Sequence, residues 1–356
     1  MPLVLDGAHR GVRTWSELTV HQHDPPLLAQ QVLQGRHRMC LVATTNPRPG
    51  LNHVDRLLSA SACPAILSPI RHEWELSVRW PTLCAFRPSA GTRAGGRAGE
   101  RLYGAALDLG IAAAARASLP AYRARRGEAG QGFQVGIPGA IDLAMFTFGP
   151  AGVPRYAGRF AEALAGAMHE VHALAGQDVV FQVEIPAELV LLTRAPRPAR
   201  KALAGVLARR VADLVLGAPA GARFGVHLCL GDLNHRALGR MGDAGPFVLL
   251  ANALAERWPS SRPLEYVHAP LAAAVDPPVD DARFYGPLRD LRLGGARLVA
   301  GYAHERQDLA VQRRIRGYVE DAAGRPVDVS TSCGLGRRDR AGAVAAMDRI
   351  RELLDD

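Results

Sequence analysis

Downstream of Arg101, short apolar runs alternate with longer segments whose apolar residues recur at helical spacing. The apolar runs predict six strands, at residues 132–138, 179–186, 224–232, 264–268, 296–303 and 327–330. The longer segments predict helices at residues 153–175, 197–216, 246–258, 281–291, 307–322 and 340–354. Near-continuous apolar strands that alternate with helices are typical of a parallel sheet covered by helices. The pattern therefore predicts an α/β fold.

Two arrangements of such a sheet fit this pattern. A doubly wound open sheet that binds a dinucleotide carries Gly-x-Gly-x-x-Gly after its first strand, and this motif is absent from the sequence. Polar and ionisable residues gather instead at the carboxyl ends of several strands, as they do in a (β/α)8 TIM-like barrel. An eight-stranded barrel needs two strands beyond the six, and residues 3–5 and 102–107 are the best candidates. We therefore predict a barrel over residues 101–356.

Residues 1–100 differ from the rest of the chain. Half of the histidines, three of the five cysteines and three of the four tryptophans lie here, yet helical or strand periodicity is scarce. Residues 87–100 are rich in Gly, Arg and Ala, as linkers are. Cys40, Cys63 and Cys84 do not have the spacing of a metal site. We predict an irregular N-terminal segment, with the possibility that it makes the barrel incomplete.

The formal net charge of +9 is compatible with an anionic partner such as nucleic acid. Lys201 is the only lysine, however, and no aromatic residues interleave with the dispersed arginines as they do on a single-strand binding surface. We therefore expect no nucleic-acid partner. No apolar run is long enough to span a membrane and the N-terminus lacks the pattern of a secretion signal, which predicts a cytoplasmic protein without a membrane partner.

His227 and Cys229 lie two residues apart in the predicted strand 224–232. Successive side chains of a strand alternate between its faces, so these two are expected to point the same way. A second thiol, Cys333, follows the predicted strand 327–330. Imidazole and thiolate are donors that Zn²⁺ favours, so the three residues predict a metal site at the strand ends. The competing interpretation is that they are ordinary buried packing residues.

The pattern His227-x-Cys229, followed much later by Cys333-Gly-Leu-x-x-Arg338, resembles the zinc site of the cobalamin-independent methionine synthases, in their C-terminal barrel. The resemblance covers residues 100–356 and implies zinc as the cofactor. In that family a glutamate that follows an intervening strand is the fourth ligand. At the matching strand end this sequence has His268, which we predict as the fourth ligand, with Glu265 as the alternative.

A second segment, Gln182-Val-Glu-Ile-Pro-Ala187, resembles the Gln-Ile-Asp-Glu-Pro-Ala segment of the same family, whose acidic residue holds the amino group of the amino-acid substrate. The resemblance implies that Glu184 binds the substrate ammonium, with Gln182 beside it. Glu188 lies one helical turn further on and could do the same. A carboxylate near a helix N-terminus is also favourable in its own right, without any ligand.

The segment Gly301-Tyr-Ala-His304-Glu305 follows the next strand and resembles the site of a family histidine that passes a proton during methyl transfer. Histidine titrates near neutral pH and suits that role, which makes His304 the candidate catalytic residue. The alternative is that His304 caps the helix that follows it. Asp232 follows Cys229 by three residues, and we expect it to lie at the same strand ends and to contact the substrate.

These resemblances imply zinc-dependent, cobalamin-independent methyl transfer to a homocysteine-like thiol. The partners would be a small-molecule thiol and a methyl donor. The Gly-Ser-x-Pro-type loop that follows the first strand in the family is missing here, because Leu5 is followed by Asp-Gly-Ala-His-Arg. Two alternatives are a metal-free enzyme resembling uroporphyrinogen decarboxylase and a degenerate barrel that binds a ligand without catalysis.

Overall fold

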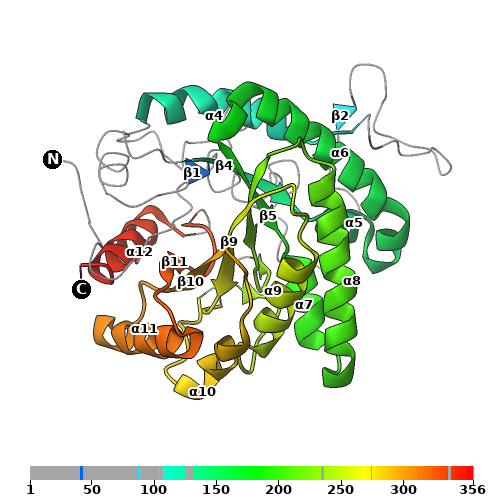
Figure 1. Ribbon diagram of the computed structural model, residues 1–356. Coiled ribbons are helices and arrows are strands. Elements are labelled where there is room, and N and C mark those ends of the chain that lie inside the picture. The colour runs from blue at the N-terminus through cyan, green and yellow to red at the C-terminus, as the bar shows by residue number, and fades with distance from the viewer. Residues whose placement is uncertain are drawn as a thin grey trace, which may run out of the picture.

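The computed structural model describes residues 41–42, 87–88, 104, 107–125, 132–233, 236–273, 275–335 and 338–355. Within this part of the chain, seven strands form one sheet in the order β1-β4-β5-β6-β9-β10-β11, and helices flank it (Figure 1). All neighbouring strands of this sheet pair in parallel. Parallel strands need crossover connections, and helices supply them here.

The strands of the parallel sheet are β1 (Leu41–Val42), β4 (Phe133–Pro138), β5 (Val179–Glu184), β6 (Arg223–His227), β9 (Leu264–Pro270), β10 (Arg297–Ala303) and β11 (Asp328–Thr331). The α-helices are α4 (Ile111–Arg125), α5 (Ala140–Phe148), α6 (Val153–Ala175), α7 (Pro186–Arg194), α8 (Arg197–Leu216), α9 (Gly245–Arg257), α10 (Ala282–Tyr285), α11 (Leu309–Ala323) and α12 (Arg340–Glu352). Short 3₁₀ helices are η2 (Pro150–Gly152), η3 (Gly176–Asp178) and η4 (Gly286–Asp290). Two separate antiparallel pairs are β2 (Arg87–Pro88) with β3 (Leu107–Asp108), and β7 (Asp232–Leu233) with β8 (Arg236–Ala237).

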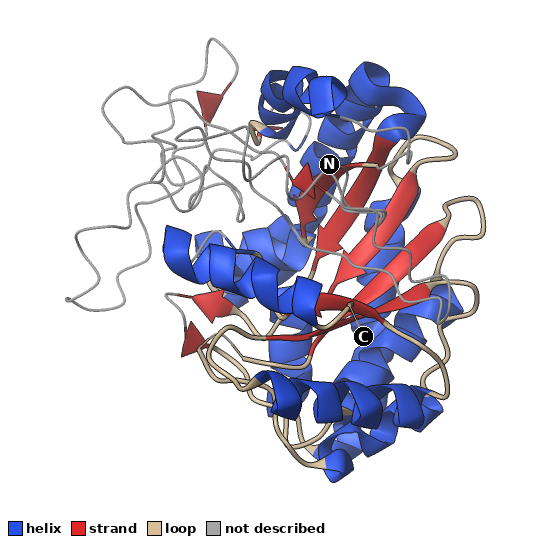
Figure 2. Ribbon diagram, turned by 90° about the vertical axis from the view of Figure 1, so that its left-hand side faces the viewer, coloured by secondary structure: helices blue, strands red, loops and turns tan. Residues whose placement is uncertain are grey.

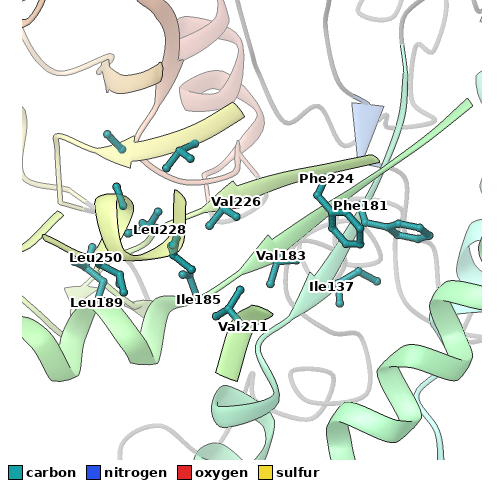
Figure 3. Packing of buried hydrophobic residues seen from close by; sticks show 14 of the residues in the cluster. Ile137, Phe181, Val183, Ile185, Leu189, Val211, Phe224, Val226, Leu228 and Leu250 are labelled. Atoms are coloured by element: carbon teal, nitrogen blue, oxygen red, sulfur yellow. The ribbon is translucent and has the colours of Figure 1, made fainter. Parts of the chain in front are cut away.

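One face of the sheet is apolar and packs beneath the helices. Alternate residues of β4, β5 and β6 supply this face, and they are fully buried together with helix residues such as Leu189 and Leu250 (Figure 3). The rings of Phe181 and Phe224 lie with their centroids 5.7 Å apart within this core. Burial of each large apolar side chain stabilises the fold by about 1.5–3 kcal/mol, which explains the near-continuous apolar strands.

The opposite face of the same strands carries polar side chains. The strand register places Gln134, Gln182 and Tyr266 on this face. The Tyr266 hydroxyl lies 3.0 Å from Gln134 Oε1 and 2.9 Å from Gln182 Oε1, so it hydrogen-bonds with strands β4 and β5 from strand β9. Figure 2 shows the strands of the sheet with the helices packed against it. Hydrogen bonds between side chains of the strands, rather than contacts with the helices, therefore hold the polar side chains of this face in position.

Local sequence explains where several helices begin and end. The side chain of Asp308 accepts a hydrogen bond from the Ala310 amide at the start of α11, and Asp339 does so from the Gly342 amide at the start of α12. Both are favourable N-caps. Helix α11 ends at Ala323, and the next residue, Gly324, has a φ of +65°, the left-handed conformation that glycine adopts readily.

The six strands predicted downstream of residue 131 are present, and the predicted helices agree to within a few residues. Strand β6 ends earlier than predicted, at His227, so Cys229 lies in the segment that follows the strand. Of the candidate strand 102–107 only residues 104 and 107 are described, and Leu107 belongs to β3, which pairs antiparallel with β2. Helices α4, α5 and α7 were not predicted. Closure into an eight-stranded barrel remains a prediction, and the candidate strand 3–5 lies outside the described residues, as do Cys40, Cys63 and Cys84. No helix of the described part is long and apolar enough to cross a membrane.

The contact between Gly225 and Tyr266 generates a stability prediction. A Cβ atom on Gly225 would lie 2.0 Å from Cζ of the Tyr266 ring, which the register holds against it. Gly225→Ala should therefore lower the free energy of unfolding by about 1–3 kcal/mol, as overpacking of a buried site does. Gly158→Ala is the control, because Gly158 lies in helix α6 with nothing within 4 Å of an added Cβ, and it should gain up to about 1 kcal/mol. Urea unfolding measures both, and equal stability of the two variants would contradict the packing.

Candidate metal centre

Three predicted ligands meet at the carboxyl ends of β6 and β11. His227 is the last residue of β6, Cys229 follows it, and Cys333 follows β11. One donor atom from each of the three lies within 4.8 Å of the other two. His227 and Cys229 are buried and Cys333 is partly exposed. The prediction that these residues lie together is confirmed, whereas a metal bound by them remains a proposal.

The distances within this group fit a tetrahedral metal ion. The two sulfur atoms, Cys229 Sγ and Cys333 Sγ, are 3.9 Å apart. Two thiolates bound to one Zn²⁺ at about 2.3 Å and at the tetrahedral angle would have their sulfur atoms about 3.8 Å apart. Nitrogen and sulfur are also the donors that structural and catalytic zinc sites use. The residues therefore fit zinc in both chemistry and spacing.

The strand register places two further predicted residues in one row with His227. Glu184 of β5 is the register partner of His227, and His227 is in turn the partner of His268 on β9. Neighbouring strands are about 4.8 Å apart, so side chains of such partners lie side by side on the same face. The imidazole rings of His227 and His268 are stacked with their centroids 4.6 Å apart. The row brings Glu184 and His268 to the edge of the His227, Cys229 and Cys333 group.

His268 is 5 % exposed, and its two ring nitrogens have different surroundings. Nε2 lies 2.9 Å from the carbonyl oxygen of Thr331. Nδ1 makes no hydrogen bond of good geometry within the described residues, and the backbone of Leu228 is a second hydrogen-bonding neighbour of the ring. Burial, together with the nearby charge of His227, lowers the pKa of His268 to about 3. The ring is therefore neutral at neutral pH. A carbonyl oxygen only accepts hydrogen bonds, so the single ring proton is on Nε2 and donates to Thr331.

The alternative fourth ligand, Glu265, is engaged elsewhere. Its Oε1 atom lies 2.5 Å from Nε of Arg223, at the opposite end of strands β6 and β9 from His227. The register between these strands shifts at this point, which accommodates Glu265 as an extra residue. The compact donor group found among the described residues contains neither Glu265 nor His268.

The predicted substrate-binding residues Glu184 and Gln182 lie on the polar face of the sheet. Glu184 is half-buried and lies over Gly136 of β4, where a Cβ atom would be 2.7 Å from Glu184 Oε1. Gln182 is buried, and its amide donates to Glu184 Oε1 at 3.4 Å while its oxygen contacts the Tyr266 hydroxyl. This hydrogen bond from Gln182 orients the Glu184 carboxylate. The side chain of Asp232 lies outside the described part of the chain.

The predicted catalytic residue His304 follows strand β10 and is fully buried. Gln312 of α11 holds its backbone on both sides, since Oε1 accepts from the His304 amide at 3.0 Å and Nε2 donates to the His304 carbonyl at 2.5 Å. The His304 Nδ1 atom accepts a hydrogen bond from the Arg306 amide at 3.2 Å. The N-cap of α11 is Asp308, so His304 does not cap that helix.

Sequence reasoning missed a buried pair of carboxyl groups, Asp142 of α5 and Glu188 of α7. They meet over Gly139, where a Cβ atom would lie 2.4 Å from Asp142 Oδ2 and 3.2 Å from Glu188 Oε1. Burial and the neighbouring Glu188 charge raise the pKa of Asp142 well above its usual range, and burial raises the pKa of Glu188 to about 7. Asp142 Oδ1 accepts from the Ala187 amide at 2.8 Å. The signal in the sequence was a lone aspartate inside the apolar segment 141–148.

No protein-family model matches the sequence, and no curated protein matches it. Among solved structures, this chain has a distant similarity to a B12-independent methionine synthase from Shewanella sp. W3-18-1 in complex with selenomethionine. The two chains share 13 % sequence identity with a TM-score of 0.44, over 62 % of this chain and 61 % of the other. The chain thus matches less than two thirds of the length of that synthase.

The Asp142–Glu188 pair predicts how stability depends on pH. A carboxyl group whose pKa is higher in the folded than in the unfolded protein makes the folded state hold extra protons, so the free energy of unfolding falls as pH rises between the two values. For Glu188 this loss runs from about pH 4.5 to about pH 7. We expect Glu188→Gln to reduce the loss by on the order of 1–3 kcal/mol. Denaturant unfolding between pH 4.5 and 8 measures it.

The control for this experiment is Glu170→Gln, since Glu170 is exposed on helix α6. That variant should follow the wild-type curve of unfolding free energy against pH. A Glu188→Gln curve that also follows the wild type would show that Glu188 does not hold an extra proton in the folded protein.

Proposed function

We propose that this protein is a zinc-dependent, cobalamin-independent methyltransferase that transfers a methyl group to the sulfur of a homocysteine-like thiol. The observation that carries the proposal is the meeting of His227, Cys229 and Cys333 donor atoms within 4.8 Å of one another, from segments far apart in the sequence. The sequence motifs around these residues resemble those of the cobalamin-independent methionine synthases, and this resemblance supports the same function.

Each residue of the proposed site has a separate task. His227, Cys229 and Cys333 hold the metal, which when bound lowers the pKa of a coordinated thiol so that it is a thiolate at neutral pH. Glu184 lies one strand from His227 and accepts hydrogen bonds from the ammonium group of the substrate. Its carboxylate therefore fixes the amino-acid end of the thiol at a set distance from the metal ligands, and this orientation lowers the entropic cost of reaction.

His304 has the task of a proton carrier on the methyl donor in this proposal. Its Nδ1 atom already accepts the Arg306 amide, so the neutral ring carries its proton on Nε2. Nε2 is then the atom that exchanges a proton with a donor molecule. The methyl donor is a small molecule in this proposal, and zinc is the only cofactor.

A metal-free decarboxylase is the less favoured alternative. Its chemistry gives no reason for two thiols 3.9 Å apart beside an imidazole. A binding protein that has lost catalysis would keep the metal and lack transfer activity, so the metal and the activity have to be measured separately.

The first test of the proposal is metal content. Purified protein should hold about one zinc ion per chain by elemental analysis, because the three donors form one site. Cys229→Ser combined with Cys333→Ser should remove the zinc. The matched control is the triple variant Cys40→Ser, Cys63→Ser and Cys84→Ser, which replaces the other cysteines and should keep the zinc. Zinc retained in the double variant, or lost only in the triple variant, would place the metal elsewhere.

The second test concerns substrate binding by Glu184. Glu184→Gln removes a charge-assisted hydrogen bond worth about 1.5–3 kcal/mol, so kcat/KM for homocysteine should fall about 10- to 100-fold. A thiol of similar length without an amino group should be used equally well, or equally poorly, by the two proteins. Methyl transfer to each thiol, followed by mass spectrometry with several candidate donors, gives the comparison. A similar loss with both thiols would show that Glu184 does not bind the ammonium.

A further inference from the structure

One row of residues across strands β4, β5, β6 and β9 alternates glycine with large polar side chains. The strand register pairs Gly136 with Gln182. It also pairs Gly225 with Gln182 on one side and with Tyr266 on the other. Because Gly225 has no side chain, the Tyr266 ring crosses β6 at this point and reaches Gln182. The row lies two residues before Glu184 along β5, and therefore on the same face of the sheet.

The Tyr266 hydroxyl has two close acceptor positions and only one proton. It lies 2.9 Å from Gln182 Oε1 and 3.0 Å from Gln134 Oε1, and a phenol donates a single hydrogen bond. The contact of Gln182 with Glu184 decides which oxygen receives the proton. Gln182 Nε2 lies 3.4 Å from Glu184 Oε1, and an ionised carboxylate only accepts hydrogen bonds. The Gln182 nitrogen therefore faces Glu184, its oxygen faces Tyr266, and the hydroxyl donates to that oxygen.

The amide of Gln134 approaches the same hydroxyl from strand β4. Its Nε2 atom is buried and has no hydrogen-bond partner in the described structure. A half-turn about the last side-chain bond exchanges Nε2 with Oε1, and the nitrogen then donates to the Tyr266 oxygen. This orientation gives the nitrogen an acceptor and removes the contact between two acceptor oxygens. The donors then all point in one direction, from Gln134 through Tyr266 and Gln182 to Glu184, and form one hydrogen-bond chain.

We propose that this hydrogen-bond chain fixes the Glu184 carboxylate, and that Tyr266 is a positioning residue for recognition of the substrate ammonium. The inference rests on the proposed role of Glu184 and adds the residues that hold its carboxylate in place. Hydrogen bonds in a chain polarise one another, so donation by Tyr266 strengthens the bond from Gln182 to Glu184. Tyr266 and Gln182 are both buried, where the lower dielectric makes these hydrogen bonds electrostatically stronger than in water.

Gly136 gives a second constraint on the Glu184 carboxylate. A Cβ atom on Gly136 would lie 2.7 Å from Glu184 Oε1 and 3.4 Å from Glu184 Cδ, so the carboxylate lies directly over this glycine. The carboxylate is thus held by the Gln182 amide and by close approach to the β4 backbone. An alanine at position 136 would meet only the end of a flexible side chain. We therefore expect Gly136→Ala to displace the carboxylate while the protein still folds.

The first test compares Tyr266→Phe in two backgrounds, with homocysteine and with the analogue of homocysteine that lacks the amino group. The substitution removes the hydroxyl and keeps the ring against Gly225. In wild-type protein, kcat/KM for homocysteine should fall about 2- to 10-fold through KM, the effect of one neutral hydrogen bond, and the analogue should be unaffected. In Glu184→Gln protein the same substitution should change neither thiol, because the carboxylate through which Tyr266 acts is gone. Equal losses in both backgrounds, or with both thiols, would overturn the role of Tyr266.

Matched variants separate positioning from general loss of stability. Gly136→Ala should also lower kcat/KM for homocysteine and leave that for the analogue unchanged, whereas Gly158→Ala should change neither. Tyr285→Phe is the control for loss of a tyrosine hydroxyl, because this hydroxyl donates to the Val279 carbonyl at 2.7 Å. It should not alter the preference between the two thiols. The same preference in Gly136→Ala as in wild type would contradict a carboxylate held over that glycine.

A measurement without substrate distinguishes this inference from the proposed function. In nitrogen-15 NMR spectra, the side-chain amide of Gln182, assigned with a Gln182→Leu variant, should shift in Tyr266→Phe and stay in place in Tyr285→Phe. A Gln182 amide unmoved by Tyr266→Phe would overturn the hydrogen-bond chain, even in a protein that transfers methyl groups. A shifted amide in a protein that transfers no methyl group would support the chain and overturn only the proposed function.

Discussion

The parallel register of β5, β6 and β9 is the constraint on which the candidate site depends. It places Glu184, His227 and His268 in one row across three strands, at the end where their carboxyl termini meet. A shift of one residue in any of these strands would turn its polar side chain into the apolar, helix-covered face. The core residues Val183, Val226 and Val267 therefore fix the site as firmly as its own contacts do, because they occupy the alternate positions.

The same packing determines the protonation of the buried groups near the two ends of this row. At His268, burial favours the neutral ring and the Thr331 carbonyl selects its tautomer. At Asp142 and Glu188, burial favours the protonated carboxyl, and Glu184 adds a further charge that raises the pKa of Asp142. Desolvation disfavours charge at both places. Glu184 lies between them and is half-buried, whereas Asp142 and Glu188 are buried.

The sequence predicted the structure well wherever the spacing of neighbouring residues along the chain determines the type of element or the face on which a side chain lies. Alternation of apolar strands with helices predicted strands β4, β5, β6, β9, β10 and β11 and most of the helices between them, and the spacing of His227 and Cys229 predicted a pair of donors. It was not informative about pairings between distant segments. The contact of Asp142 with Glu188 depends on how α5 and α7 pack over Gly139. The local sequence around either residue does not predict that the two helices meet there. The pairing of Glu265 with Arg223 likewise depends on a register shift between β6 and β9.

The curvature of the sheet brings the candidate metal ligands together. In the sheet order, β9 and β10 separate β6 from β11, so in a flat sheet the two cysteine-bearing strand ends would be about 14 Å apart, at about 4.8 Å per step. The Cys229 and Cys333 sulfur atoms are nevertheless 3.9 Å apart. The polar face must therefore be strongly concave, as the interior of a barrel is. A metal bound there would link the two strand ends and stabilise that curvature, because its binding free energy adds to the folding free energy.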